Sequence, residues 1–172
     1  MMIDDLTYVK ETSSIWIDAV KRVGCRAIIQ LPVADLSFLD AGDQIFKVSR
    51  APYKTVFPRC AMVVHHGGAG TTQSSLIAGR PTVVVAHMAD QFFWGSELQR
   101  LGVSGKTLMR KGLTSGRLAE AIQNVLADTN MVDKAEALGH QLETEDGVTV
   151  AIALIEQAIG ARLTSRECKT ND

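Results

Sequence analysis

Several common site patterns are missing from this sequence. No G-x-G-x-x-G dinucleotide fingerprint occurs, and the glycine-rich stretch at residues 67–70 is not followed by the lysine of a Walker A loop. The three cysteines, Cys25, Cys60 and Cys168, are scattered and fit neither a zinc spacing nor a disulfide framework. A reducing, cytoplasmic location is therefore expected.

An excess of charge of either sign is also missing. The chain has 18 Lys and Arg residues against 19 Asp and Glu residues, a formal net charge of −1. No basic cluster suggests binding to nucleic acid or to a membrane surface. No apolar stretch approaches the length of a membrane span, and Met1–Asp5 is acidic without the apolar core of a signal peptide. We expect no nucleic-acid partner and no transmembrane segment.

The length and composition fit one folded domain. The 172 residues are 46% hydrophobic and 22% charged, as in an ordinary soluble α/β protein. We expect a single domain over residues 1–161 and a polar C-terminal tail over residues 162–172, frayed at the chain end.

The first helix has an ambiguous start. Trp16, Val20 and Val23 follow a helical spacing and predict an amphipathic helix. Residues 6–9 either extend it backwards, giving one helix over residues 5–23, or form a short strand, since three of the four favour strands. We favour the helix.

Strand and helix patterns then alternate along the chain. Strands are predicted at residues 26–31, 44–48, 61–65, 82–86 and 105–108, and helices from Gly70, Asp90 and Thr114 or Ser115, over 131–143, and along an apolar stripe of Val148, Ile152, Ile155 and Ile159. Such alternation predicts a parallel sheet with helices on both faces.

The stretch around residues 61–72 is the strongest candidate for a site. An apolar strand runs into a glycine turn, and the next helix begins near Gly70. The free N–H groups and dipole of a helix N-terminus form an anion site, most often for phosphate. His66 lies at its mouth as a further donor, or is a structural histidine. Thr71 and Thr72 either donate hydroxyls to phosphate oxygens or cap the helix.

Three stretches in order, His65–Thr72, Ala78–Thr82 and Asp90–Gly95, resemble the donor-binding region of UDP-dependent glycosyltransferases. The resemblance is greatest to sterol glucosyltransferases and their bacterial relatives. It implies a Rossmann-like domain that is one half of a GT-B architecture. It also implies a UDP-sugar donor substrate, with no metal and no other cofactor.

The resemblance also implies roles for individual residues. The diphosphate would be bound by His66, Gly67, Gly68, Gly70, Thr71 and Thr72, the uracil and ribose by Arg50 and Ser74, and the donor sugar by Asp90 and Gln91. Arg50 replaces a Trp that often stacks on uracil, and Ser74 replaces a Glu that binds ribose in plant relatives. His87, Met88 and Ala89 depart from the aromatic and glycine residues usual before the Asp-Gln pair. From position alone, a helix cap is the favoured role of Asp90, and the resemblance reverses that preference.

Parts of the family pattern are absent. The opening strand with its Phe-Gly-Ser-type turn has no counterpart, nor has the acceptor domain, whose His deprotonates the acceptor hydroxyl in an inverting displacement. We therefore predict no catalytic residue and no turnover by this chain alone. The alternatives are the donor-binding subunit of a split glycosyltransferase with an acceptor-domain partner chain, and a non-catalytic fragment without ligand.

The absent strand has a structural consequence. In the doubly wound order the first strand lies in the middle of the sheet, so its absence leaves unpaired backbone groups on two strands. We therefore predict a homo-oligomer, most simply a homodimer.

Overall fold

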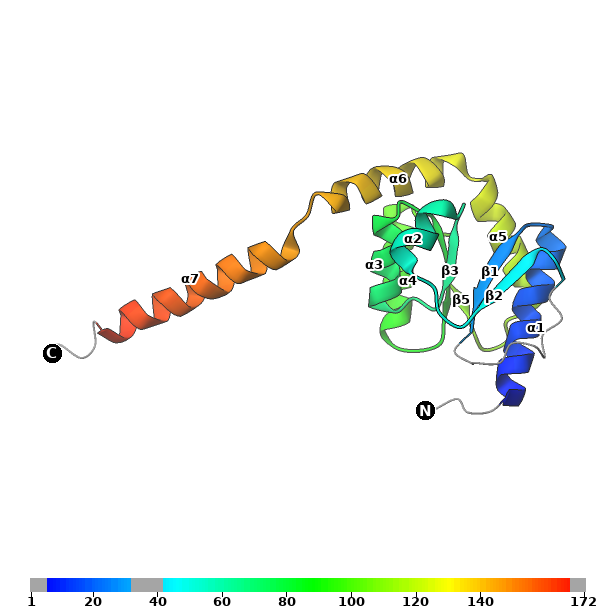
Figure 1. The fold of residues 1–172 in the computed structure, drawn as a ribbon, viewed down its shortest axis with the longest axis horizontal. Coiled ribbons are helices and arrows are strands. Elements are labelled where there is room, and N and C mark those ends of the chain that lie inside the picture. Colours follow the sequence, from blue (N-terminus) through cyan, green and yellow to red (C-terminus); the bar gives the residue numbers. More distant parts are fainter. Residues whose placement is uncertain (1–5, 32–41, 168–172) are drawn as a thin grey trace. The chain divides into compact units, whose positions relative to one another are not determined.

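The computed structural model describes residues 6–31 and 42–167 (Figure 1). The chain divides into two units, Met1–His140 and Gln141–Asp172. In chain order the elements are α1 (Leu6–Val23), β1 (Ala27–Gln30), β2 (Ile45–Val48), α2 (Tyr53–Val56), the 3-10 helix η1 (Phe57–Arg59), β3 (Val63–His65), α3 (Ala69–Ile77), β4 (Thr82–Ala86), α4 (Asp90–Leu101), β5 (Leu108–Met109), α5 (Ser115–Ala127), α6 (Thr129–Glu143) and α7 (Gly147–Glu167). Residues 6–9 belong to α1, so the predicted long helix is confirmed and the strand alternative is wrong.

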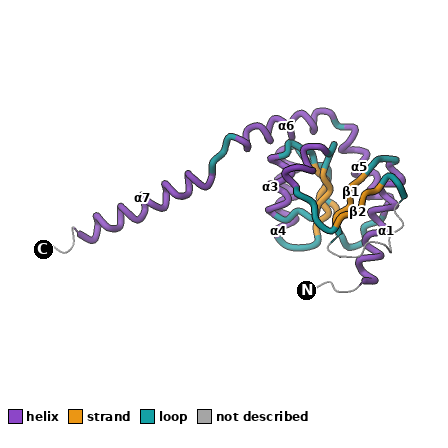
Figure 2. The backbone as a smooth tube through the Cα atoms, in the orientation of Figure 1, coloured by secondary structure: helices purple, strands orange, loops and turns teal. Residues whose placement is uncertain are grey.

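The strands form two parallel groups (Figure 2). β1 pairs with β2, Ala27 opposite Ile45, and β4 pairs with β3 and with β5. The predicted α/β class with parallel strands is therefore confirmed. Among the described residues β1 and β3 do not pair with each other. The residues before α1, where the family's opening strand would lie, are outside the described ranges, and the predicted oligomer stays a prediction.

The last strand is shorter and later than predicted. It begins at Leu108 rather than at residue 105. The backbone N–H of Thr107 donates to Oε1 of Gln99 on α4, at 3.3 Å, rather than to the neighbouring strand. A side chain therefore replaces a ladder bond at this point, which periodicity alone does not reveal.

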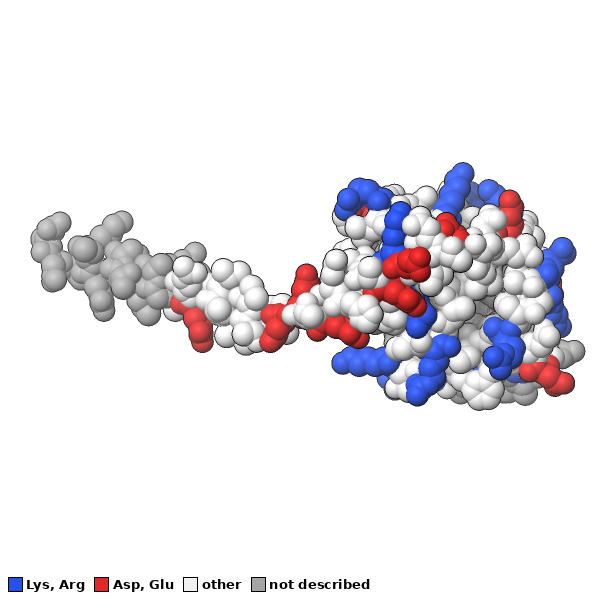
Figure 3. All heavy atoms as spheres, turned by 90° about the horizontal axis from the view of Figure 1, so that it is seen from above, with Lys and Arg blue, Asp and Glu red and all other residues white. Residues whose placement is uncertain are grey.

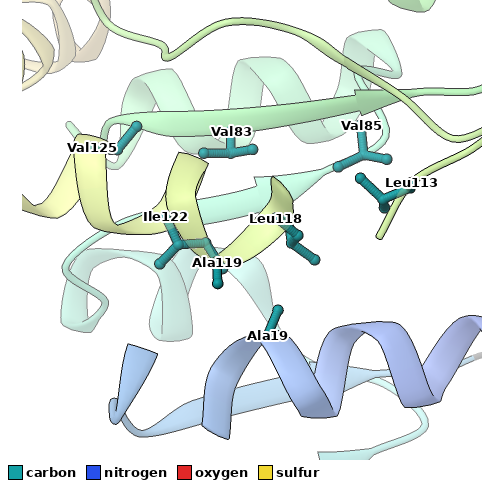
Figure 4. Packing of buried hydrophobic residues seen from close by; sticks show 8 residues of the cluster. All are labelled: Ala19, Val83, Val85, Leu113, Leu118, Ala119, Ile122 and Val125. Atoms are coloured by element: carbon teal, nitrogen blue, oxygen red, sulfur yellow. The ribbon is translucent and has the colours of Figure 1, made fainter. Parts of the chain in front are cut away.

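Helix α1 joins the two groups of strands. Ile17 and Val20 pack with Leu31 and Ile45 beside β1 and β2. Ala19, which is fully buried, packs on the other side with residues of α5 and β4 (Figure 4). Burial of each such aliphatic side chain contributes about 1.5–3 kcal/mol. The helix therefore takes its position from apolar contacts to both groups.

Strand β4 is buried on both faces. Val83 and Val85 pack with α5, as Figure 4 shows, while Val84 and Ala86 pack with a cluster that includes Leu98 of α4. A parallel strand covered on both sides reads as a continuous apolar run, as this one does. The predicted helices on both faces are confirmed for this strand.

The surface carries mixed charge. Figure 3 shows Lys and Arg side chains interspersed with Asp and Glu side chains over the face in view. No helix in the described part of the chain has the length and apolar character needed to span a membrane.

The second unit contains α7. Exposed apolar residues of this helix include the predicted stripe, Val148, Ile152, Ile155 and Ile159, and also Leu154. The helix also continues through Glu167, beyond the predicted start of the polar tail. The apolar residues of α7 point to more than one side, so the interpretation of a one-sided amphipathic helix is corrected.

Candidate functional site

The turn between β3 and α3 has the geometry of an anion site. Gly67 has a φ of +88°, which glycine adopts without strain, and Gly68 is the N-cap residue of α3, with no side-chain cap. The backbone N–H of Thr72 already donates to the carbonyl of Gly68, at 3.0 Å. The N–H groups of residues 69–71 precede it in the first turn, where an α-helix offers them no partner of its own. They and the helix dipole favour an anion here.

His65 holds this turn from inside. Its ring is buried, and Nδ1 accepts a hydrogen bond from the backbone N–H of Gly67 at 3.0 Å. Burial lowers the pKa of His65 to about 4, with a smaller lowering by neighbouring His66. The ring is therefore neutral at pH 7, as an Nδ1 acceptor requires. This contact gives His65 a structural role in the turn.

The turn lies directly against the start of α4. A Cβ added to Gly67 would stand 2.9 Å from the backbone oxygen of Gln91 and 2.9 Å from Cγ1 of Val84. Only a glycine leaves room for this approach. The structure thus brings together the glycine turn and the Asp90–Gln91 pair, which lie more than twenty residues apart in the sequence.

The turn between β4 and α4 is built differently. Ala89 is the N-cap residue, with φ 43° and ψ −120°, and the backbone N–H of Gln91 donates to the carbonyl of Met88 at 3.1 Å. This is a type II′ turn, whose first central position favours glycine. Oε1 of Gln91 accepts from the backbone N–H groups of His87, at 2.7 Å, and Met88, at 3.3 Å. Gln91 therefore fixes the turn through its amide oxygen.

Asp90 occupies the first position of α4 and not the N-cap. The reading of Asp90 as a helix cap is therefore wrong, because Ala89 takes the cap position and α4 has no side-chain cap hydrogen bond. Asp90 is exposed next to Gln91. Its carboxylate is accessible to a ligand at this edge.

The other predicted residues differ in how they face solvent. His66 is exposed, and Thr71 is half-buried. Thr72 is almost fully buried, and its hydroxyl has no hydrogen-bond partner within the described part of the chain. Ser74 donates its hydroxyl to the carbonyl of Gly70 at 2.8 Å, and Arg50 is exposed after β2.

Two residues that the sequence analysis did not assign to the site lie at the same edge. The ring of His87, after β4, is 6.5 Å from the ring of His66, between centroids. The backbone N–H of Arg110, after β5, donates to the carbonyl of Ala86 at 2.8 Å. Parallel strands end at the same edge of a sheet. The positions directly after β4 and β5 could therefore have identified these two residues from the sequence.

No group of three or more His, Cys, Asp or Glu side chains that could hold a metal ion is found over residues 6–31 and 42–167. The site thus offers imidazoles, backbone N–H groups, one carboxylate and one carboxamide. Such groups suit an anion beside a polyhydroxylated ligand.

Comparison with known proteins gives the following. Residues 14–155 match the family described as "Erythromycin biosynthesis protein CIII-like, C-terminal domain". The sterol 3-beta-glucosyltransferase UGT80B1 of Arabidopsis thaliana is 34% identical over 145 residues, which are 83% of this chain and 23% of that protein. The chain thus spans about a quarter of that relative.

Solved glycosyltransferases share the fold. The glycotransferase of kitacinnamycin superposes with a TM-score of 0.75 at 21% identity, over 91% of this chain and 41% of that one. The structure of LpCGTa in complex with UDP superposes with a TM-score of 0.69 at 12% identity, over 86% of this chain and 36% of that one.

Proposed function

The chain belongs to the family of erythromycin biosynthesis protein CIII-like C-terminal domains, found in glycosyltransferases, and from this premise we propose that it binds a UDP-sugar donor. The observation that carries the proposal is the contact of the β3–α3 turn with the start of α4. A phosphate-type site and a carboxylate–carboxamide pair then face one ligand. A nucleotide diphosphate joined to a sugar has both kinds of group.

The diphosphate occupies the β3–α3 turn in this proposal. His66 and the backbone N–H groups of the first turn of α3 donate to its oxygens, while Gly67 and Gly68 allow its close approach. Thr71 adds its hydroxyl. Thr72 is assigned the same role, since its hydroxyl is without a partner in the described residues.

The remaining contacts follow the order of the ligand. Arg50 stacks on or bonds to the uracil, because a guanidinium is planar. Ser74 accepts from the ribose, its own proton being donated to Gly70. Asp90 and the amide N–H₂ of Gln91 bind hydroxyls of the sugar. No metal takes part in this scheme.

The catalytic role proposed is donor binding for an inverting transfer. Binding orients the anomeric carbon, and the turn stabilises the charge that develops on the UDP leaving group. None of the residues assigned here is a base for the acceptor hydroxyl, so in this proposal these residues do not turn over by themselves. Their proposed ligands are cytoplasmic nucleotide sugars. A purified chain that transfers sugar by itself, in a manner dependent on Asp90, would contradict this.

A split enzyme is the second candidate. In this candidate a separate partner chain would carry the acceptor domain, and a homodimer is the other assembly that we propose. If the chain proved to be a monomer that binds no acceptor domain, this candidate would be removed.

Calorimetric titration with UDP and several UDP-sugars tests the proposal. We expect UDP to bind, and His66→Ala to weaken it about tenfold or more, as for a hydrogen bond to a charged group of about 1.5–3 kcal/mol. Ser96→Ala, on the exposed side of α4, serves as the control. A folded chain that binds no UDP at millimolar concentration overturns the proposal and leaves the non-catalytic fragment.

A further inference from the structure

We propose that His87 is a second imidazole for the donor's diphosphate, so that His66 and His87 bind the distal phosphate group between them. This inference rests on the proposed function and adds to it a residue that neither the sequence motifs nor the comparisons assign. With this second imidazole, the site prefers a diphosphate to a single phosphate.

The positions of the two rings carry the inference. His66 follows β3 and His87 follows β4, so both lie at the carboxyl edge of paired parallel strands. Their centroids are 6.5 Å apart and their planes meet at 83°. A ring nitrogen lies about 1 Å from its centroid, and an N–H···O bond spans about 2.9 Å. One phosphate group therefore fits between nitrogens of both rings.

The backbone of His87 is held in place. Its N–H donates to Oε1 of Gln91 at 2.7 Å, and the carbonyl of the preceding Ala86 accepts from the N–H of Arg110. The side chain itself is exposed. A fixed backbone with an exposed ring presents a donor to a ligand with little loss of order on binding.

The charges around His87 favour an anion. Arg110 faces it from the end of β5, with its guanidinium donating to the hydroxyl of Thr12 on α1, and His66 faces it from the end of β3. Partial burial is the largest cause that lowers the pKa of His87, followed by the charges of Arg110 and His66. A phosphate group among these side chains would replace repulsion between cations by attraction. The nearest acid along the chain, Asp90, is assigned to the sugar.

Three ligands distinguish binding of the distal phosphate from binding of the rest of the nucleotide. UDP has both parts, UMP lacks the distal phosphate, and inorganic pyrophosphate lacks the nucleoside. Titration of the full chain compares the native protein with His87→Phe, which keeps a ring but has no N–H, and with His87→Gln, which keeps a donor. His140→Gln on α6 is the matched control, since the neighbouring Gly139 approaches Gly79 at the opposite end of β4. Thermal melting checks that each variant is folded.

We expect His87→Phe to weaken UDP and pyrophosphate about tenfold and UMP less than twofold, and His87→Gln to recover part of the loss. An unchanged ratio of UDP to UMP affinity in His87→Phe, with that variant folded, would overturn the inference while leaving the proposed function standing. Binding of pyrophosphate but not UDP would overturn the proposed function, and the pyrophosphate loss in His87→Phe would still support the inference. Binding of neither ligand by the native chain overturns both.

Discussion

The turns after β3 and after β4 lie against each other. Each connects a strand to the helix that follows it and is held in shape by a side chain, but the two turns are built from different residues. The first is made of glycines, with Gly67 in the left-handed region and a buried imidazole as its inner support. The second has Ala89 at a positive φ and a carboxamide side chain as its support. The first turn therefore exposes backbone without strain, whereas the second holds strain that Gln91 must offset. We therefore expect added atoms in the first turn to destabilise the fold, and a substitution that removes the strain of the second turn to stabilise it.

Gly67→Ala is expected to have the largest effect. The new Cβ would meet Val84 and the backbone of Gln91 at 2.9 Å, in a conformation with a φ of +88°. Strain and overpacking together predict a loss of about 4 kcal/mol in the free energy of unfolding. Chemical denaturation measures the loss, and calorimetry should show no UDP binding.

Gly70→Ala is the matched control for that change. It has no atom within 4 Å of an added Cβ and lies inside α3. Alanine should therefore raise the free energy of unfolding by about 0.5–1 kcal/mol. Equal destabilisation by both substitutions would show that crowding against α4 is not the reason for the glycine at position 67.

His65 is expected to have the next largest effect. His65→Leu leaves the buried N–H of Gly67 without its acceptor, which costs about 2 kcal/mol. His65→Asn places an acceptor near the position of Nδ1 and should lose less. Similar losses for Leu and Asn would mean that packing, and not the hydrogen bond, is what His65 supplies.

The same residue predicts a dependence on pH. The pKa of His65 is about 4 in the folded chain against 6.5 as the ordinary value. Between these values the unfolded chain binds the proton more strongly, so the contribution is fully present above pH 6.5 and is lost as the pH falls toward 4. Native stability should fall by up to about 3 kcal/mol more than that of His65→Asn over this window, measured by urea denaturation. Parallel curves for the two proteins would contradict it.

The sequence predicted one of these turns better than the other. The glycines, the helix start and the buried strand before them are local signals, so the geometry around Gly67 was predictable. The alternative in which Asp90 is the N-cap was wrong, because a type II′ turn places Ala89 at that position. Alanine is not a turn residue by preference, so composition offered no signal for it.

Contacts between distant segments were predictable only in part. The parallel strands implied that the residues after β3 and β4 meet at one edge, but the contact itself depends on the missing side chain of Gly67, which lets this turn approach the backbone of Gln91. The exposure of Ile155 and its neighbours on α7 had no local signal, since the same spacing fits a packed helix.

Ala89→Gly should relax the second turn. A φ of 43° with ψ of −120° costs an alanine about 1–3 kcal/mol, while glycine adopts it freely but loses more backbone entropy on folding. The net expectation is a gain of about 1 kcal/mol in the free energy of unfolding, seen as a higher melting temperature. Ala78→Gly, at the end of α3 with φ −70°, is the control and should destabilise. A loss in both variants would show that the turn at Ala89 holds no strain.

Asp90→Asn is expected to change stability least and specificity most. Asp90 is not the N-cap, so the substitution removes only the interaction of its charge with the helix dipole, about 0.3–1 kcal/mol. Asparagine keeps the volume and one acceptor oxygen but loses the charge that would bind sugar hydroxyls. The ratio of UDP-sugar to UDP affinity should therefore fall while UDP affinity itself stays nearly constant, because the diphosphate lies at the other turn. Glu120→Gln, an acid-to-amide change at an exposed position of α5, controls for a general effect of removing one negative charge. An equal loss for both ligands in Asp90→Asn would mean that Asp90 supports the turn and that the two turns do not divide the ligand between them.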